Sequence, residues 1–355
     1  MYIIITDMKI GMIGLPQTGK KALFELLTGH KPSENEVASG KPINGVAEIR
    51  DSRFDALVAM YKPKKEVRAR IELELLPKIE KDAISKGDIF TDIAEVDALC
   101  HVVRAFKDDS IYHASGSVDP KRDIDAINSE LLLHDLIFIE KRFERLDKKI
   151  KQTKEEASIK ERDLLAKLKA HLEKDQPLRT LEISADEDKL LTSYPFLTRK
   201  EIIIALNVSE DQLKSKPPVE GDNIMQVSAK VEAEIAALDS EEERKAFLTD
   251  LGITEPAMNI LTRLCLKTLK LISFFTVGQD EVRQWNVKAG ATAAEAAGVI
   301  HSDLQKGFIR AELIKLNDLK ELGSEDAVKA QGKFYLKGKD YIVEDGDILS
   351  IRFNV

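Results

Sequence analysis

A glycine-bounded loop joins a short apolar run to an amphipathic segment within residues 9–28, KIGMIGLPQTGKKALFELLT. The apolar run predicts a buried strand, and the apolar spacing after Lys20 predicts a helix. Gly14 and Gly19 allow the backbone to turn and to approach a ligand closely. The loop N–H groups and the helix N-terminus then face an anion, and Lys20 adds a positive charge. This order of elements predicts a phosphate-binding loop in an α/β domain.

One position departs from the usual loop pattern. The lysine is normally followed by Ser or Thr, whose hydroxyl coordinates Mg²⁺ beside the phosphates. Lys21 stands there instead, and a cation cannot ligate a metal ion. An ordinary glycine-rich turn between strand and helix is the alternative interpretation. Whether the loop handles a Mg-nucleotide in the usual way is a separate question.

Length and composition limit the class of protein. With 355 residues the chain is long for one domain, so about two or three are expected. It has no run of about 18 apolar residues, and residues 1–10 make a poor signal peptide. We therefore expect a cytoplasmic protein without a membrane partner. Cys100 and Cys265 lie in apolar surroundings and predict buried thiols rather than a disulfide or zinc site.

The charge balance is acidic. The formal net charge of −8 gives no global attraction to nucleic acid. We therefore expect no DNA partner, and any RNA contact would need a local basic patch.

The segment after the loop helix lacks a second expected motif. Residues 29–45 are polar and predict an exposed, mobile loop. Residues 46–50 and 67–76 predict two strands around a helix at 52–61, as beside the first switch region of GTPase-type domains. There the second strand leads into Asp-x-x-Gly, whose Asp holds the Mg²⁺ shell and whose Gly N–H reaches the γ-phosphate. Leu75-Leu76-Pro77-Lys78 occupies this place, so both groups are missing.

A long helical hairpin is predicted in the middle of the chain. Residues 79–91 are polar and charged, and 92–103 predict the end of a helix and a core strand. Ser117 or Asp119 can then cap a helix that begins with Pro120. Apolar residues three and four apart continue this helix to Ile150, and a second helix follows around residues 159–172.

The charged stretch at 148–162 is the predicted tip of this hairpin. A solvated face is the ordinary interpretation of such charge runs. Interspersed acidic residues weaken an RNA-binding interpretation. The best local candidate for an RNA- or ribosome-facing surface is nevertheless the basic set Lys141, Arg142, Arg145, Lys148, Lys149, Lys151 and Lys154.

Two later strands end in polar residues. The apolar run at 200–207 predicts a central parallel strand that ends in Asn207-Val208-Ser209-Glu210. A short strand at 224–227 ends in Ser228-Ala229-Lys230. The carboxyl edge of a parallel sheet is where α/β proteins bind ligands. We therefore expect both polar ends beside the glycine loop.

The last third of the chain changes character. Residues 240–271 are predicted to be helical, with breaks at Gly252 and Pro256. Strands follow near 282–287 and 311–316 with a helix at 292–300, and the chain ends in a predicted hairpin at 341–353. This β-rich part with one main helix predicts a β-grasp domain.

At this point the chain resembles the YchF family of Obg-like ATPases, a branch of the translation-factor class of P-loop NTPases. The resemblance runs from Met8 to Val355 and is strongest in the segments TVGQDEVRQWNVKAGATAAEAAGVIHSDLQKGFIRAE and GKDYIVEDGDILSIRFNV, which are similar to the family's TGS domain. It implies an α/β fold with a GTPase-like domain at 1–116 and 185–273. An inserted antiparallel helical coiled coil at 117–184 and a β-grasp TGS domain at 274–355 complete the implied organisation.

The resemblance also implies a nucleotide site. The family loop usually reads Gly-x-Pro-x-x-Gly-Lys-Ser-Thr, whereas this chain has Lys21 and Ala22 in place of Ser-Thr. Its Asn-x-x-Glu motif, here Asn207 to Glu210, replaces the guanine-reading Asn-Lys-x-Asp and favours ATP over GTP. Ser39 lies near the place of the first-switch Thr. The implied nucleotide-binding residues are Gly14, Pro16, Gln17, Thr18, Gly19, Lys20, Lys21, Ala22, Asn207, Val208, Glu210, Ser228 and Ala229.

Members of this family bind and slowly hydrolyse ATP and associate with ribosomes. Since the loop hydroxyl, the Asp and the Gly of the metal and γ-phosphate machinery are all missing, we expect a divergent member with weak or no hydrolysis. We name no catalytic or metal-ligating residue. Lys21 could partly replace Mg²⁺ as a counter-charge. The alternative is a non-catalytic scaffold whose coiled coil and TGS domain bind RNA or the ribosome.

Overall fold

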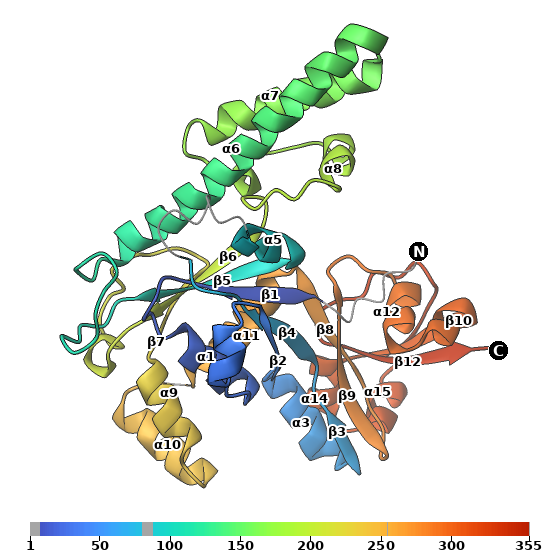
Figure 1. Ribbon diagram of the computed structural model, residues 1–355. Coiled ribbons are helices and arrows are strands. Elements are labelled where there is room, and N and C mark those ends of the chain that lie inside the picture. The colour runs from blue at the N-terminus through green and yellow to red at the C-terminus, as the bar shows by residue number, and fades with distance from the viewer. Residues whose placement is uncertain (1–7, 80–87, 254, 355) are drawn as a thin grey trace.

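The computed structural model describes residues 8–79, 88–253 and 255–354 (Figure 1). Residues 80–87, part of the predicted charged segment, lie outside this range. The described chain forms two six-stranded sheets, and the first has the order β2-β4-β1-β5-β6-β7. Its neighbours are parallel except for the antiparallel pair β2–β4. Its strands are β1 (Lys9–Ile13), β2 (Ile43–Glu48), β4 (Arg70–Leu75), β5 (Ala98–Arg104), β6 (Glu201–Asn207) and β7 (Ile224–Val227).

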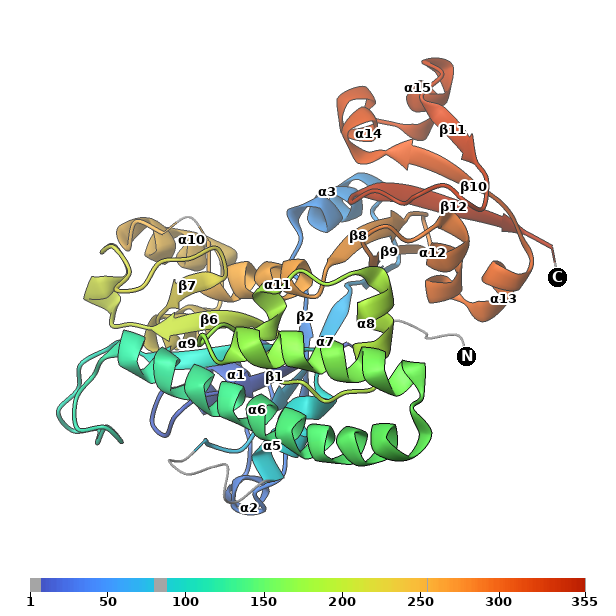
Figure 2. The same ribbon diagram turned by 90° about the horizontal axis from the view of Figure 1, so that it is seen from above.

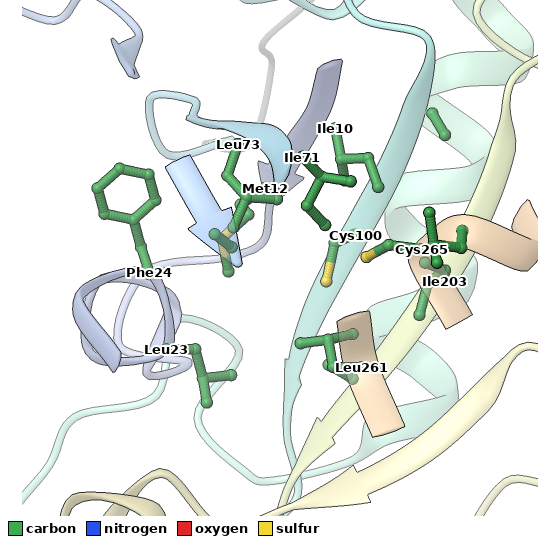
Figure 3. Close-up of a cluster of buried hydrophobic side chains, with 14 of the residues drawn as sticks. Ile10, Met12, Leu23, Phe24, Ile71, Leu73, Cys100, Ile203, Leu261 and Cys265 are labelled. Carbon is green, nitrogen blue, oxygen red and sulfur yellow. The ribbon is translucent and has the colours of Figure 1, made fainter. Parts of the chain in front are cut away.

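Helices cover both faces of this sheet. On one face the strands pack against α1 and α11, and Figure 3 shows Phe24 of α1 and Leu261 of α11 in that core. On the other face Leu99 and Ile202 pack with residues of α5 and α6. Cys100 and Cys265 are buried free thiols, as predicted. These helices and their neighbours are α1 (Lys20–Thr28), α5 (Asp88–Glu95), α8 (Ala185–Leu191), α9 (Ala229–Ala236), α10 (Glu241–Asp250) and α11 (Ala257–Thr268).

The predicted helical hairpin is present as α6 (Pro120–Thr153) and α7 (Glu156–Leu172), which project from the sheet (Figure 1). Asp119 caps α6 by accepting a hydrogen bond from Arg122 N–H. The predicted tip at 148–162 is too long, because only Lys154 and Glu155 separate the helices. Lys, Glu and Gln favour helix, and the ion pair between Lys149 and Glu155 stabilises the turn. Within the described residues, no helix has the length and apolar character needed to span a membrane.

The predicted loop at 29–45 is wrong in part, because it contains the short helix α2 (Glu34–Ala38). Ser33 and Glu36 form a capping box: Ser33 Oγ accepts from Glu36 N–H, and the Glu36 carboxylate accepts from Ser33 N–H. This S-x-x-E signature satisfies two backbone donors and starts the helix despite the polar composition.

The strand predicted at 67–76 is present as β4 (Arg70–Leu75), whereas Val67 ends a separate short strand of the other sheet. β3 (Lys65–Val67) pairs in parallel with β9, whereas β4 starts at Arg70. The chain crosses between the sheets at Arg68, whose guanidinium lies over the Phe54 ring. The preceding helix α3 (Ser52–Tyr61) packs its Phe54 and Leu57 against residues of the C-terminal sheet. Figure 2 accordingly shows α3 beside that module.

The second sheet has the order β11-β10-β12-β8-β9-β3. The predicted hairpin at 341–353 is wrong, because Ile342 forms a bridge with Thr292 while β12 pairs with β10 and β8. The Asp347 carboxylate holds this turn by accepting from Glu344 N–H and the Tyr341 hydroxyl. The remaining elements are β8 (Leu271–Thr276), β9 (Glu281–Lys288), α12 (Ala293–Ile300), α13 (Ser302–Lys306), β10 (Phe308–Lys315), α14 (Leu316–Leu322), α15 (Glu325–Ala330), β11 (Phe334–Lys337) and β12 (Asp347–Phe353).

Candidate functional site

The glycine loop lies at the carboxyl edge of the first sheet. Because β1, β5, β6 and β7 are parallel, the residues that follow them meet at this edge. The loop at 14–19 follows β1, Phe106 follows β5 closely, Asn207 ends β6 and Ser228 follows β7. The structure therefore brings together the strand ends that the sequence predicts to be neighbours.

The loop backbone is bent in the way an anion cradle requires. Gly19 has φ of 87° and Gln17 of 63°. A Cβ on Gly14 would lie 2.5 Å from the carbonyl oxygen of Val102, so a side chain does not fit there. Helix α1 begins directly at Lys20 and receives no side-chain cap from Gly19. Its first N–H groups are therefore left for an anion.

Asn207 clamps the loop to the end of β7. Its Nδ2 donates to the carbonyl oxygen of Thr18 at 2.9 Å, and its Oδ1 accepts from Ala229 N–H at 3.1 Å. The amide is buried; the bond to Thr18 is buried with it, and the bond to Ala229 is partly buried. A Cβ on Gly19 would overlap Asn207 Nδ2. The Asn207 side chain therefore packs against Gly19 only because Gly19 has no Cβ, and the shape of the loop at 14–19 depends on both residues.

The other residues that the resemblance places around the nucleotide base differ in burial and in hydrogen bonding. Ser228 is buried and caps α9 by accepting from Val231 N–H. Val208 is buried, and its N–H donates to the carbonyl oxygen of Val227. Glu210 is exposed at the start of the short helix η2 (Glu210–Gln212). Its carboxylate makes no hydrogen bond with another residue in the described part of the chain.

Sequence reasoning missed Arg104 and Phe106. The buried Arg104 guanidinium donates to backbone carbonyls of Phe106, Asp108 and Ile111, and so shapes the loop after β5. It lies 4.6 Å from the centre of the Phe106 ring. The N–H of Phe106 donates to the carbonyl oxygen of Asn207 at 3.1 Å. An aromatic residue just past a predicted central strand was the only available sequence signal.

Lys20 is held by backbone carbonyls. Its Nζ donates to the carbonyl oxygens of Leu76 at 2.6 Å and Pro77 at 3.1 Å. No carboxylate of the described residues pairs with it. Burial without a counter-charge lowers the pKa of Lys20 to about 7. Burial, together with the nearby Lys20 charge, lowers the pKa of His101 to about 3, so His101 is neutral at physiological pH.

The lowered pKa of Lys20 leads us to expect that phosphate affinity depends on pH. A bound phosphate favours the charged ammonium, so the pKa of Lys20 is higher in the complex than in the free protein, and binding takes up a proton. The affinity for a phosphate-bearing ligand should therefore be highest below pH 7 and fall by about tenfold per unit above it. Calorimetric titrations from pH 6 to 9 measure this slope. Lys20→Arg keeps its charge throughout and should show a nearly flat profile, and an equal slope in both proteins would contradict the assignment to Lys20.

The residues present do not fit the usual Mg²⁺ shell. Lys21 and Ala22 are exposed and offer no hydroxyl. Leu76 and Pro77 supply only carbonyls, and these already face an ammonium. Ser39 is exposed, and its hydroxyl donates to the Glu36 carbonyl. Among the residues that the structure describes, no group of three or more His, Cys, Asp and Glu side chains could hold a metal ion.

The basic set on the helical hairpin is partly neutralised. Arg142 pairs with Glu161, and Lys149 pairs with Glu155. These contacts reduce the positive field that this surface offers to a polyanion.

Comparisons with known proteins now add to this geometry. The family model YchF-GTPase_C, described as a protein of unknown function (DUF933), matches residues 271–354. The chain is 40% identical to "Ribosome-binding ATPase YchF" of Bacillus subtilis (strain 168), over 97% of this chain and 99% of that protein. It is 36% identical to "Obg-like ATPase 1" of Oryza sativa subsp. japonica, over 99% of this chain and 93% of that protein.

A solved structure agrees over the whole fold. The YchF GTPase of Schizosaccharomyces pombe is similar with a TM-score of 0.83 and 31% identity, over 98% of each chain. The two-sheet α/β architecture, the helical insertion and the C-terminal module are therefore those of a known family. The resemblance found in the sequence is confirmed: this chain belongs to the YchF family of Obg-like ATPases.

Proposed function

We propose that this protein binds ATP in preference to GTP, hydrolyses it weakly or not at all, and acts on the ribosome in the cytoplasm. The observation that carries the proposal is the Asn207 clamp, which joins the phosphate loop to the base-side loop at Ala229. A site that no longer binds nucleotide would not need the Asn207 side chain to hold these two loops together. The names of the relatives, which are ribosome-binding ATPases and Obg-like ATPases, support the same class of function.

The residues around the proposed base position support a preference for adenine over guanine. Guanine-specific sites place an Asp where this chain has Glu210, and that position is exposed and without a hydrogen bond to the described chain. Phe106 lies next to Asn207, because its N–H donates to the Asn207 carbonyl oxygen, and an aromatic ring can stack on any base. We infer that the Phe106 ring stacks on adenine, that Asn207 holds the surrounding loops in place, and that Val208, Ser228 and Ala229 lie beside the base.

Phosphate binding would rely on chain residues rather than on a metal. The loop N–H groups and the α1 N-terminus surround the phosphates, and Lys20 exchanges its two carbonyl partners for phosphate oxygens. Exposed Lys21 supplies a further positive charge. No residue at Leu76 or Pro77 orients water or a metal, so the rate of hydrolysis stays low.

We propose the division of the chain that the sequence predicts, except that α3 and β3 pack with the C-terminal sheet. The nucleotide domain spans 1–116 and 185–273, the coiled coil 117–184 and the TGS domain 274–355. We infer that the last two parts contact the ribosome through local surfaces, because the net charge is −8 and the helical basic set is partly paired.

A second candidate function is a scaffold without a working nucleotide site, which the capture of Lys20 by two carbonyls favours. Calorimetric titration of ATP and GTP, each with Mg²⁺ and with EDTA, separates the two. We expect ATP to bind more tightly than GTP and to keep its affinity within about threefold in EDTA. Failure of either nucleotide to bind under any condition would leave the scaffold as the function.

A further inference from the structure

A cavity of about 290 Å³ lies at the base of the helical hairpin. It sits at the amino-terminal end of β6, whereas the clamp residue Asn207 is at the other end. Seven strand residues span roughly 20 Å, so this cavity is separate from the phosphate loop. Its walls are the first turns of α6 and the chain that returns from α7 to β6. The polar residues that line it are Asp125, Asn128, Ser129, Asp175, Arg179 and Thr198.

Arg179 is the unusual group of this cavity. It lies in the short helix η1 (Leu178–Thr180) and is partly buried. Its guanidinium makes no hydrogen bond or ion pair with any other residue that the structure describes. Burial lowers the pKa of Arg179, and only the charge of Glu201 acts against this effect. A guanidinium withdrawn from water without a partner favours binding of an anion.

The wall that carries Arg179 is fixed in place. Arg179 N–H donates to the carbonyl oxygen of Thr198 at 3.0 Å. The Thr198 hydroxyl donates to Asp135 of α6 at 2.7 Å and accepts from Leu178 N–H. The guanidinium is therefore held on a rigid support, which lowers the entropy cost of binding.

The remaining lining residues define the rest of the ligand. Asn128 and Ser129 offer an amide and a hydroxyl on one side of the cavity, and Asp125 and Asp175 offer exposed carboxylates at its rim. None of these four side chains makes a hydrogen bond or ion pair with another residue that the structure describes. Such a set matches a molecule with one anionic group and several neighbouring hydroxyls. The volume is at the small end of ligand pockets.

We propose that this cavity binds a small polyhydroxylated anion, a sugar phosphate or a sugar acid. Arg179 holds the anionic group. Asn128, Ser129 and the two aspartates bind the hydroxyls. The proposal does not depend on nucleotide binding at the phosphate loop.

The test is calorimetry on the full chain at low ionic strength, with ribose 5-phosphate, gluconate and uncharged ribose as probes. One of the two anions should bind at submillimolar to millimolar concentration, and ribose should bind at least tenfold more weakly. Arg179→Met should weaken binding at least tenfold. Arg145→Met removes an exposed arginine of α6 that lies outside the cavity and should leave the affinity for the anion unchanged. Lys20→Ala should also leave the affinity unchanged.

Thermal unfolding supplies a second readout. Arg179→Met removes an uncompensated charge, so its midpoint without ligand should be equal to or above that of the natural protein. The anion should raise the midpoint of the natural protein but not that of the variant. If Arg179→Met does not fold, Asn128→Ala serves instead and should weaken binding about threefold or more. The proposal is overturned if neither anion binds at millimolar concentration, if Arg179→Met binds normally, or if Lys20→Ala abolishes binding.

Discussion

Replacing Asn207 with alanine should lower ATP affinity by about 100-fold. The substitution removes both bonds of the clamp and leaves the buried Thr18 carbonyl oxygen and the partly buried Ala229 N–H without these partners. Each orphaned group costs about 1–3 kcal/mol, divided between stability and binding. Since every 1.4 kcal/mol is a factor of ten, about 3 kcal/mol lost from binding gives this change. Calorimetric titration measures the affinity, and urea denaturation measures the lost stability.

Asn223→Ala is the matched control. Asn223 precedes β7, is only partly buried, and its side chain makes no hydrogen bond with the described chain. This substitution should change ATP affinity by less than about twofold. If Asn207→Ala binds ATP as well as the natural protein, the clamp does not organise a nucleotide site, and the proposed function loses its main support.

Replacing Asp135 with alanine should destabilise the protein by about 3–5 kcal/mol. The Asp135 carboxylate on α6 is fully buried and accepts from the N–H groups of Leu197 and Thr198 and from the Thr198 hydroxyl. Alanine would leave these three donors buried without an acceptor. The substitution also cuts the link between α6 and the chain that enters β6.

Urea unfolding followed by circular dichroism tests this loss. Glu144→Ala is the control, because Glu144 is an exposed carboxylate on the same helix that pairs with no other described residue, and it should change stability by less than about 0.5 kcal/mol. Asp135→Asn keeps the shape but points an amide at the donors, so it should also be strongly destabilising. Equal stability of Asp135→Ala and Glu144→Ala would show that the hairpin is anchored elsewhere.

Local signals predicted much of the fold. The loop glycines placed the turn between β1 and α1, and Asp119 with Pro120 placed the start of α6. The break between β3 and β4 could not be predicted from the sequence, because the alternating pattern continues from Val67 into β4. Which sheet each of these strands joins depends on its partners elsewhere in the chain.

The sequence also predicted which strand ends meet beside the glycine loop. Asn207 and Ser228 follow apolar strands, and the parallel sheet brings such ends together. The Lys20 contact was beyond sequence reasoning, because its partners are carbonyl oxygens, which every residue has. Phe106 was missed for a related reason, since its position next to Asn207 comes from a backbone hydrogen bond, which its residue type does not predict.

The β3–β9 pairing sets an order of events during synthesis. The salt bridge that flanks it joins Lys64 to Asp280, 216 residues later in the chain. At the usual speed of translation, roughly 10 to 40 s pass between the appearance of these residues. The side chains of Phe54 and Leu57 on α3 pack against the C-terminal sheet in the folded protein, and this sheet has not yet been synthesised during that time. While the chain is being synthesised, its amino-terminal part therefore exposes apolar side chains of the kind that chaperones bind. It completes its folding only when the C-terminal sheet has emerged.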